Sequence, residues 1–252
     1  MSLSASDVVE VLLILLLSTH VTTAYEDNYS CRNTICSPRA GDLLIGRDNA
    51  LVASSTCGLE NVDTYCVVTA SGKSHCSECY SKQAYNSITN PNSHRVENVI
   101  SRVPSDPGRW WQSENALHNV TLTLNLETQF QFISTILRFK TFRPAAMYLE
   151  RSVDFAQTWQ PYAYFSNNCP RDFPSIPERP RRSLRDVTCT SIYSQLTPSE
   201  GGVVAFMAAP SEMHANLPPY SEERQNLTAI TNLRVTFTRL NTLGELHSVF
   251  LV

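Results

Sequence analysis

A strict alternation of apolar and polar residues at positions 119–126 constrains the fold of this chain more than any other feature. The apolar positions are Val120, Leu122, Leu124 and Leu126, and only threonine and asparagine lie between them. Because successive side chains of a strand point to opposite faces, this period of two predicts a strand with one buried and one exposed face.

Further strand signals follow at the spacing expected for an antiparallel sandwich. Runs rich in β-branched and aromatic residues, separated by turn residues, cover residues 136–142, 147–150, 159–165, 203–207 and 233–240. No stretch predicts a long amphipathic helix, and no long internal repeat is visible. We therefore predict an all-β fold, a jelly-roll β-sandwich, with a cysteine-rich N-terminal loop region before it at residues 25–80.

The first 24 residues have the features of a secretory signal peptide. Residues 8–17 are apolar apart from Glu10, and Ala24 is a small residue suited to signal-peptidase cleavage. An apolar run of about ten residues is shorter than the roughly 20 that a spanning helix needs. We predict a signal at residues 1–24 and a secreted mature chain from residue 25, with no membrane span.

Eight cysteines follow the predicted signal. They are Cys31, Cys36, Cys57, Cys66, Cys76, Cys79, Cys169 and Cys189. An even number in a secreted chain predicts disulfides, but not their connectivity. Short loops suggest Cys31–Cys36, Cys57–Cys66, Cys76–Cys79 and Cys169–Cys189, and only the last pair has more support than proximity, because it is isolated from the rest.

Nucleic-acid binding and catalysis are both disfavoured. A formal net charge of −3 gives no attraction to nucleic acid. The chain lacks nucleophile-elbow, H-E-x-x-H, P-loop and dinucleotide motifs. Cys76 and Cys79 form a C-x-x-C pair, which is redox-active when a helix N-terminus lowers a thiol pKa. Since no such context is predicted here, we favour a structural disulfide over a redox enzyme.

Three acceptor patterns for N-linked sugars lie in the predicted mature chain. They are centred on Asn28, Asn119 and Asn226. Asn119 opens the alternating segment on its polar side, so its sugar would point into solvent. A sugar-bearing face cannot easily be a contact face, so these positions disfavour partner contacts on the faces that carry the sugars.

An arginine- and proline-rich loop at residues 173–186 admits three interpretations. The first is an ordinary solvated basic loop, which we favour, since proline removes backbone donors and blocks strand pairing. The second is a heparan-sulfate-like anion site, because clustered arginines bind anions. The third is furin-type processing after Arg182, since Arg179, Arg181 and Arg182 fit R-x-R-R.

Several longer motifs resemble the laminin N-terminal domain. They are GDLLIGR at 41–47, STCGL at 55–59, CSEC at 76–79, NPNSHRVENV at 90–99, WWQSEN at 110–115, FKTFRPAAMYLERS at 139–152, DFAQTW at 154–159 and TNLRVTFTRLNTLG at 231–244. They occur in the same order as in that family and cover nearly all of the predicted mature chain. Their amino-acid sequences are most similar to those of laminin β chains. We identify residues 25–252 as such a domain and expect its final strand to be missing.

The resemblance implies a structural extracellular-matrix domain rather than an enzyme. Laminin N-terminal domains of α, β and γ chains join into the basement-membrane network in a calcium-dependent way, so the implied partners are α- and γ-type N-terminal domains. In γ-type and netrin relatives the loop before the tryptophans carries the calcium ligands. Here Arg109 directly precedes Trp110, and a cation disfavours a neighbouring divalent ion. We expect no metal or other cofactor in this chain, with calcium bound by partner domains.

Four residues are our candidates for the partner contact. Ser93, His94, Arg95 and Glu97 lie in a charged segment that is poor in apolar residues. An ordinary solvated loop is an equally good interpretation of this segment. For the whole chain, the alternative function is a netrin-like soluble ligand that binds a single cell-surface receptor.

Overall fold

The computed structural model describes residues 42–68, 73–100, 108–198, 200–210, 218 and 221–241. Several predictions concern residues outside these ranges. They are the signal at 1–24, the sugar site at Asn28, the pair Cys31 and Cys36, most of the loop before Trp110, and the missing final strand.

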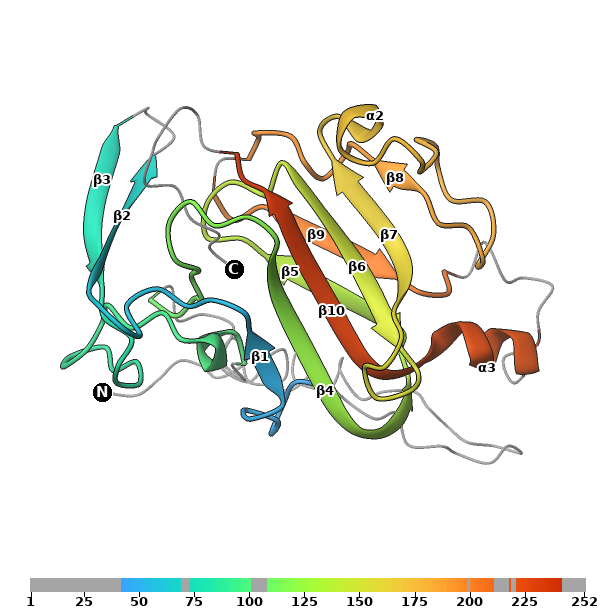
Figure 1. The fold of residues 1–252 in the computed structure, drawn as a ribbon, viewed down its shortest axis with the longest axis horizontal. Helices are drawn as coiled ribbons and strands as arrows, with labels where there is room; N and C mark the ends of the chain where they lie inside the picture. The colour runs from blue at the N-terminus through green and yellow to red at the C-terminus, as the bar shows by residue number, and fades with distance from the viewer. Residues whose placement is uncertain are drawn as a thin grey trace, which may run out of the picture. The chain divides into compact units, whose positions relative to one another are not determined.

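A six-stranded sheet forms the larger layer of the fold. In spatial order its strands are β1 (Leu51–Ala53), β4 (Val120–Gln131), β10 (Ala229–Arg239), β6 (Ala146–Ser152), β7 (Gln160–Ser166) and β8 (Cys189–Thr190) (Figure 1). Neighbouring strands are antiparallel except β7 and β8. The predicted alternation is confirmed in β4, whose four apolar side chains are at most 6% exposed. Its polar positions are intermediate or exposed.

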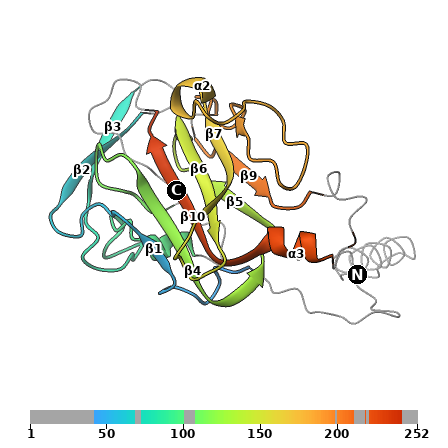
Figure 2. The same cartoon turned by 45° about the vertical axis from the view of Figure 1, so that its right-hand side comes forward.

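A second sheet pairs β5 (Ser134–Arg138) with β9 (Val203–Met207) and lies across one face of the larger sheet (Figure 2). The main core fills the space between the two layers. Its buried members from both sheets include Val204, Phe206, Met147, Leu149, Phe165 and Val235, and the partly buried Leu137 packs against them. The described chain is therefore an all-β, jelly-roll-like sandwich, as predicted.

All six predicted strand segments overlap observed strands, but the cysteine-rich region is not only loop. It contains β1 and an antiparallel hairpin of β2 (Asp63–Val68) and β3 (Ser74–Cys79). The hairpin has few large apolar residues, so its sequence lacks the alternation that marks β4. The described helices are short: η1 (Val96–Val99), α2 (Cys169–Asp172) and α3 (Glu222–Thr228).

Two of the disulfides suggested by short loops are wrong. The structure pairs Cys57 with Cys79 and Cys66 with Cys76. The hairpin register explains this, because it places Cys66 directly opposite Cys76 and leaves Cys79 at the hairpin base. The predicted Cys169–Cys189 disulfide is confirmed.

We expect Cys66–Cys76 to be reduced at least about tenfold faster than the other two described disulfides, since exchange requires a thiolate to reach the sulfur. Cys76 is exposed and Cys66 is intermediate, whereas the four cysteines of the other two bridges are 0% exposed. Brief treatment of the folded chain with dithiothreitol, alkylation and peptide mass spectrometry measures this. The buried bridges serve as internal controls, and equal labelling of all six cysteines would contradict the prediction.

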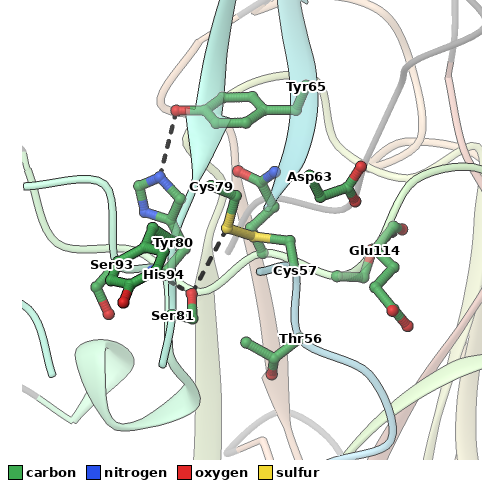
Figure 3. The surroundings of a disulfide bond; sticks show 12 residues. Thr56, Cys57, Asp63, Tyr65, Cys79, Tyr80, Ser81, Ser93, His94 and Glu114 are labelled. Atoms are coloured by element: carbon green, nitrogen blue, oxygen red, sulfur yellow. Dashed lines mark hydrogen bonds between the residues drawn. A yellow bond between two sulfur atoms is a disulfide. The ribbon is translucent and has the colours of Figure 1, made fainter. Parts of the chain in front are cut away.

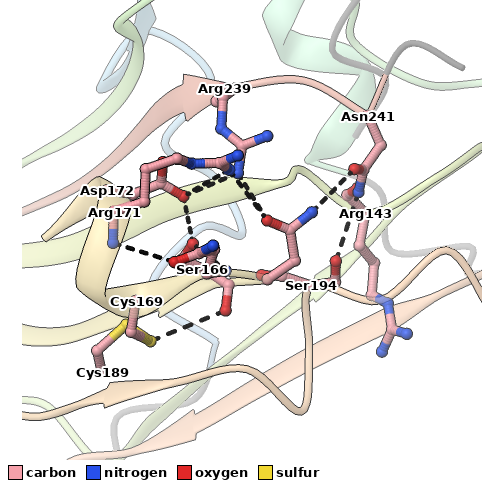
Figure 4. Close-up of polar contacts among 11 residues, drawn as sticks. Arg143, Ser166, Cys169, Arg171, Asp172, Cys189, Ser194, Arg239 and Asn241 are labelled. Atoms are coloured by element: carbon pink, nitrogen blue, oxygen red, sulfur yellow. Dashed lines mark hydrogen bonds and ion pairs between the residues drawn. A yellow bond between two sulfur atoms is a disulfide. The ribbon is translucent and has the colours of Figure 1, made fainter. Parts of the chain in front are cut away.

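A half-buried carboxylate ties the end of β10 to the end of β7 (Figure 4). Asp172 accepts hydrogen bonds from the Ser166 hydroxyl, from Arg239 at 2.8 Å and from Arg171 at 3.0 Å. Burial by itself raises the pKa of Asp172, but these donors outweigh it and hold the pKa at about 2. The strand end is therefore fixed by an ionised carboxylate at neutral pH.

The described part of the chain has no helix that is long and apolar enough to cross a bilayer.

Candidate partner-binding surface

A disulfide holds the base of the β2–β3 hairpin (Figure 3). Cys57 forms the disulfide with Cys79, and the next residue, Gly58, has φ +67°. A Cβ at position 58 would lie 2.4 Å from the carbonyl oxygen of Cys79, so only glycine fits. The backbone NH of Ser81 donates to the Gly58 carbonyl at 2.9 Å. The STCGL motif therefore sets the position of the hairpin.

His94 lies inside this base and is 1% exposed. Its Nε2 is 3.2 Å from the Tyr65 hydroxyl, and its backbone NH donates to Ser81 Oγ at 3.0 Å. Its ring stacks on Trp110 with centroids 4.1 Å apart. Burial, together with the charge of Lys140, lowers the pKa of His94 to about 4. The histidine is therefore neutral at physiological pH.

Ser93 and His94 are not surface residues, which corrects half of the predicted contact set. Ser93 is 0% exposed, and its hydroxyl donates to the Gln83 carbonyl at 2.7 Å. The Ser93 carbonyl accepts from Asn98 at 2.8 Å. Both predicted residues hold the loop together, because a polar group in the interior needs an internal partner. Neither can touch another protein in this structure.

Arg95 and Glu97 remain available as contact residues. They form an ion pair at 2.5 Å, with side chains 36% and 32% exposed. Several exposed apolar side chains lie just outside the hairpin strands and in nearby loops, and no sequence pattern predicts them. They are Leu59, Val62, Tyr80, Ile88 and Leu117. We call this set, with Arg95 and Glu97, the hairpin-base surface.

The two tryptophans of the WWQSEN motif have different environments. Trp111 is 0% exposed and lies in the main core. Trp110 is partly exposed, and the Lys140 ammonium lies 5.0 Å from its ring centroid. The doublet therefore joins the sandwich core to the hairpin-base surface.

The two described sugar acceptors lie at opposite ends of the larger sheet. Asn119 is exposed and directly precedes β4, whose first residue pairs with Phe237 near the end of β10. Asn226 is exposed on α3, which leads into the start of β10. Sugars at these positions would leave the middle of the sheet open.

The arginine-rich loop is less cationic than its sequence suggests. Arg179 pairs with Asp186 at 2.8 Å, and Arg185 pairs with Glu223 at 2.9 Å. Arg181 is partly buried, with its guanidinium 5.5 Å from the ring centroid of Phe206. Two of the four arginines are therefore neutralised by carboxylates, which weakens the case for heparan sulfate binding.

We expect furin to cleave the folded chain after Arg182 at least about tenfold more slowly than the unfolded chain. The reason is that a protease requires an opened, extended segment. Arg179 is held by Asp186, and Arg181 donates to three backbone carbonyls. The variant Asp186→Asn should be cut faster, since Asp186 also accepts from the Arg182 NH at 2.9 Å.

Cleavage would give two bands on reducing gels and one on non-reducing gels, because Cys169–Cys189 spans the loop. Equal rates for the folded and urea-unfolded chains would contradict the prediction. Cleavage after Arg182 therefore stays a prediction, and it requires the loop at 173–186 to open first.

The C-x-x-C motif is not a dithiol in this structure. Cys76 and Cys79 belong to different disulfides, so they do not form the two-cysteine couple of a redox enzyme. Within the described ranges no group of three or more metal-binding side chains is present. Arg109, which directly precedes the tryptophan doublet, has its guanidinium 5.2 Å from the ring centroid of Tyr85.

The chain is similar to a known protein family and to individual proteins. The family model for the Laminin N-terminal domain (Domain VI) matches residues 36–249. The chain is 46% identical over 237 residues to laminin subunit beta-2 of Rattus norvegicus, covering 93% of this chain but 13% of that protein. It is 36% identical over 205 residues to netrin-4 of Homo sapiens, covering 79% of this chain and 31% of netrin-4.

Among solved structures, a chitosan-binding module from a Paenibacillus chitosanase/glucanase aligns with a TM-score of 0.39 and 11% identity. The alignment covers 83% of this chain and 92% of the module. This likeness is too low to carry a functional argument. The chain spans only a small part of the length of the laminin subunit that it matches.

Proposed function

The chain belongs to the laminin N-terminal family, in which it is most like the β subunits, and we propose that it is the module by which a β-type short arm joins other laminin chains. Its setting is the extracellular matrix of the basement membrane. The proposed partners are the N-terminal domains of α- and γ-type chains. Their association would build the basement-membrane network that supports cell adhesion and tissue development.

The observation that carries this proposal is the 46% identity to a laminin β subunit over 93% of the chain. Identity to netrin-4 is lower, at 36% over 79% of the chain. We therefore rank the netrin-like receptor ligand second. In both cases the chain would act by binding, and any calcium that assembly needs would be held by the partner domains.

Sedimentation of three-component mixtures tests the proposal. The chain is mixed with an α-type module, a γ-type module, or both, in calcium and in a chelator. We expect a larger species only when all three proteins and calcium are present. A chain that stays monodisperse beside both modules would refute the proposal, and binding to a single receptor ectodomain would favour the netrin-like alternative.

The hairpin-base surface can be tested in the same assay through the Arg95–Glu97 pair. The double variant Arg95→Glu with Glu97→Arg keeps the ion pair but reverses its polarity. If this surface meets a partner, association should weaken by about tenfold, since like charges placed opposite each other are costly. Unchanged association by the folded double variant would remove Arg95 and Glu97 from the contact.

A further inference from the structure

The turn between β6 and β7 exposes two large apolar side chains. Phe155 is 60% exposed and Val153 is 39% exposed. The turn lies at the same end of the larger sheet as α3 (Figure 1). Aromatic side chains are enriched at protein interfaces, where they insert into pockets of a partner. An exposed phenylalanine at a turn is therefore a candidate contact.

The backbone of this turn is held in a conformation that its residues disfavour. Phe155 has φ 55° and Ala156 has φ 68°, which is the left-handed region that glycine adopts most easily. Two successive non-glycine residues in this region carry a conformational cost. Such strain persists only where surrounding contacts enforce it, and it is often found at functional sites.

A dense set of hydrogen bonds enforces the conformation. Asp154 accepts from the Ser152 hydroxyl at 2.6 Å and from the Thr158 backbone NH at 2.9 Å. Ser152 in turn accepts from the backbone NH of Ala156 at 2.9 Å. These donors lower the pKa of Asp154 to about 2, so its carboxylate is charged at neutral pH.

A contact from the neighbouring strand fixes Phe155 itself. Its backbone NH donates to the hydroxyl of Thr231 in β10 at 2.9 Å. Thr231 is 1% exposed, so this anchor belongs to the interior of the fold. The phenyl ring is therefore presented by a rigid support and would lose little freedom on binding.

The charged side chains beside the turn are already paired. Arg234 lies with its guanidinium 3.8 Å from the ring centroid of Trp159 and forms an ion pair with Glu150 at 2.8 Å. The Asp154 carboxylate accepts hydrogen bonds from within the turn. A partner that fits this surface therefore offers an apolar pocket rather than a strongly charged patch.

We propose that the β6–β7 turn, residues 153–159, is a docking element that inserts Phe155 into an apolar pocket on a neighbouring laminin-type N-terminal module. This proposal rests on the function proposed above and goes beyond it by naming the contact. A second copy of this chain fits less well. Arg151 at the end of β6 donates to the Asn226 carbonyl at 2.6 Å, so a symmetric pair would place two Asn226 sugars at the contact, whereas a sister module would meet only one.

The test compares the wild-type chain with Phe155→Ser, both secreted from the same cells so that they carry the same sugars. The matched control is Ile192→Ser. Ile192 is 70% exposed and follows β8, which runs parallel to β7, so it lies toward the opposite end of the sheet. Thermal unfolding of both variants should match wild type, because each side chain is mostly exposed.

Sedimentation is then measured with α- and γ-type modules in calcium. We expect Phe155→Ser to weaken association at least about tenfold and Ile192→Ser to leave it unchanged. Normal association by Phe155→Ser would overturn the docking proposal while the proposed function stands. Absence of association by the wild-type chain would overturn both, and self-association lost only in Phe155→Ser would replace the sister module with a second copy.

Discussion

Replacing Trp111 with alanine is expected to lower the free energy of unfolding by about 3–5 kcal/mol, because it empties a large volume in the core. Trp111 is 0% exposed and stacks on Phe237 with centroids 6.0 Å apart. Its Nε1–H donates to Thr56 Oγ1 at 3.0 Å. Since domains of this kind are stable by only about 5–15 kcal/mol, we also expect the variant to be secreted poorly.

The neighbouring tryptophan provides the matched control. Trp110 is partly exposed and stacks on His94, so Trp110→Ala should cost only about 1 kcal/mol. Trp111→Phe keeps a ring but loses the N–H donor, and it should fall between the two. Urea unfolding followed by circular dichroism, with secretion yields, measures all three. Equal costs for the two alanine variants would contradict the assigned environments.

The sequence predicts the strands well because their signal is local. The alternation in β4 can be read from the residues of that strand alone, because apolar side chains at every second position predict that one face of the strand is buried. The shift of β5 to Ser134–Arg138, from a prediction of 136–142, has a tertiary cause. Phe139 is 2% exposed and its NH donates to the Gly202 carbonyl at 2.8 Å, so it is buried without continuing the strand.

The candidate site was harder to predict because its environment is built from distant residues. The segment 93–97 is polar, which favours a solvated loop. His94 is nevertheless enclosed by Tyr65, 29 positions away, and by Trp110. Polar residues can be buried when long-range partners satisfy them, and no local pattern reports such partners.

Charge patterns were misleading for the same reason. The loop at 173–186 reads as basic, but Glu223, which neutralises Arg185, is 38 residues away. Similarly, the disulfides depend on the hairpin register and not on the shortest loops. The exposed Phe155 carries no local signal either, since its DFAQTW motif specifies a turn and exposure depends on what packs around it.

Acidification should destabilise the folded chain through His94. The pKa of His94 is about 4 in the folded state, mainly because of burial and then because of the Lys140 charge, whereas it is about 6.5 in an unfolded chain. Between these values the unfolded state binds a proton that the folded state does not. Stability is therefore fully present above about pH 6.5 and falls as pH drops toward 4, by a total of about 3 kcal/mol.

The variant His94→Phe tests this assignment, because phenylalanine can keep the stacking on Trp110 but cannot titrate. It should lose the hydrogen bond to Tyr65, and so be less stable at neutral pH, yet show a much flatter loss of stability between pH 6.5 and pH 4. His118→Phe, at an exposed histidine, should keep the wild-type slope. Carboxylates with a pKa of about 2, such as Asp172, release their contribution only below about pH 4 in all three proteins. Urea unfolding across this range separates the two effects, and a wild-type slope in His94→Phe would show that another group titrates.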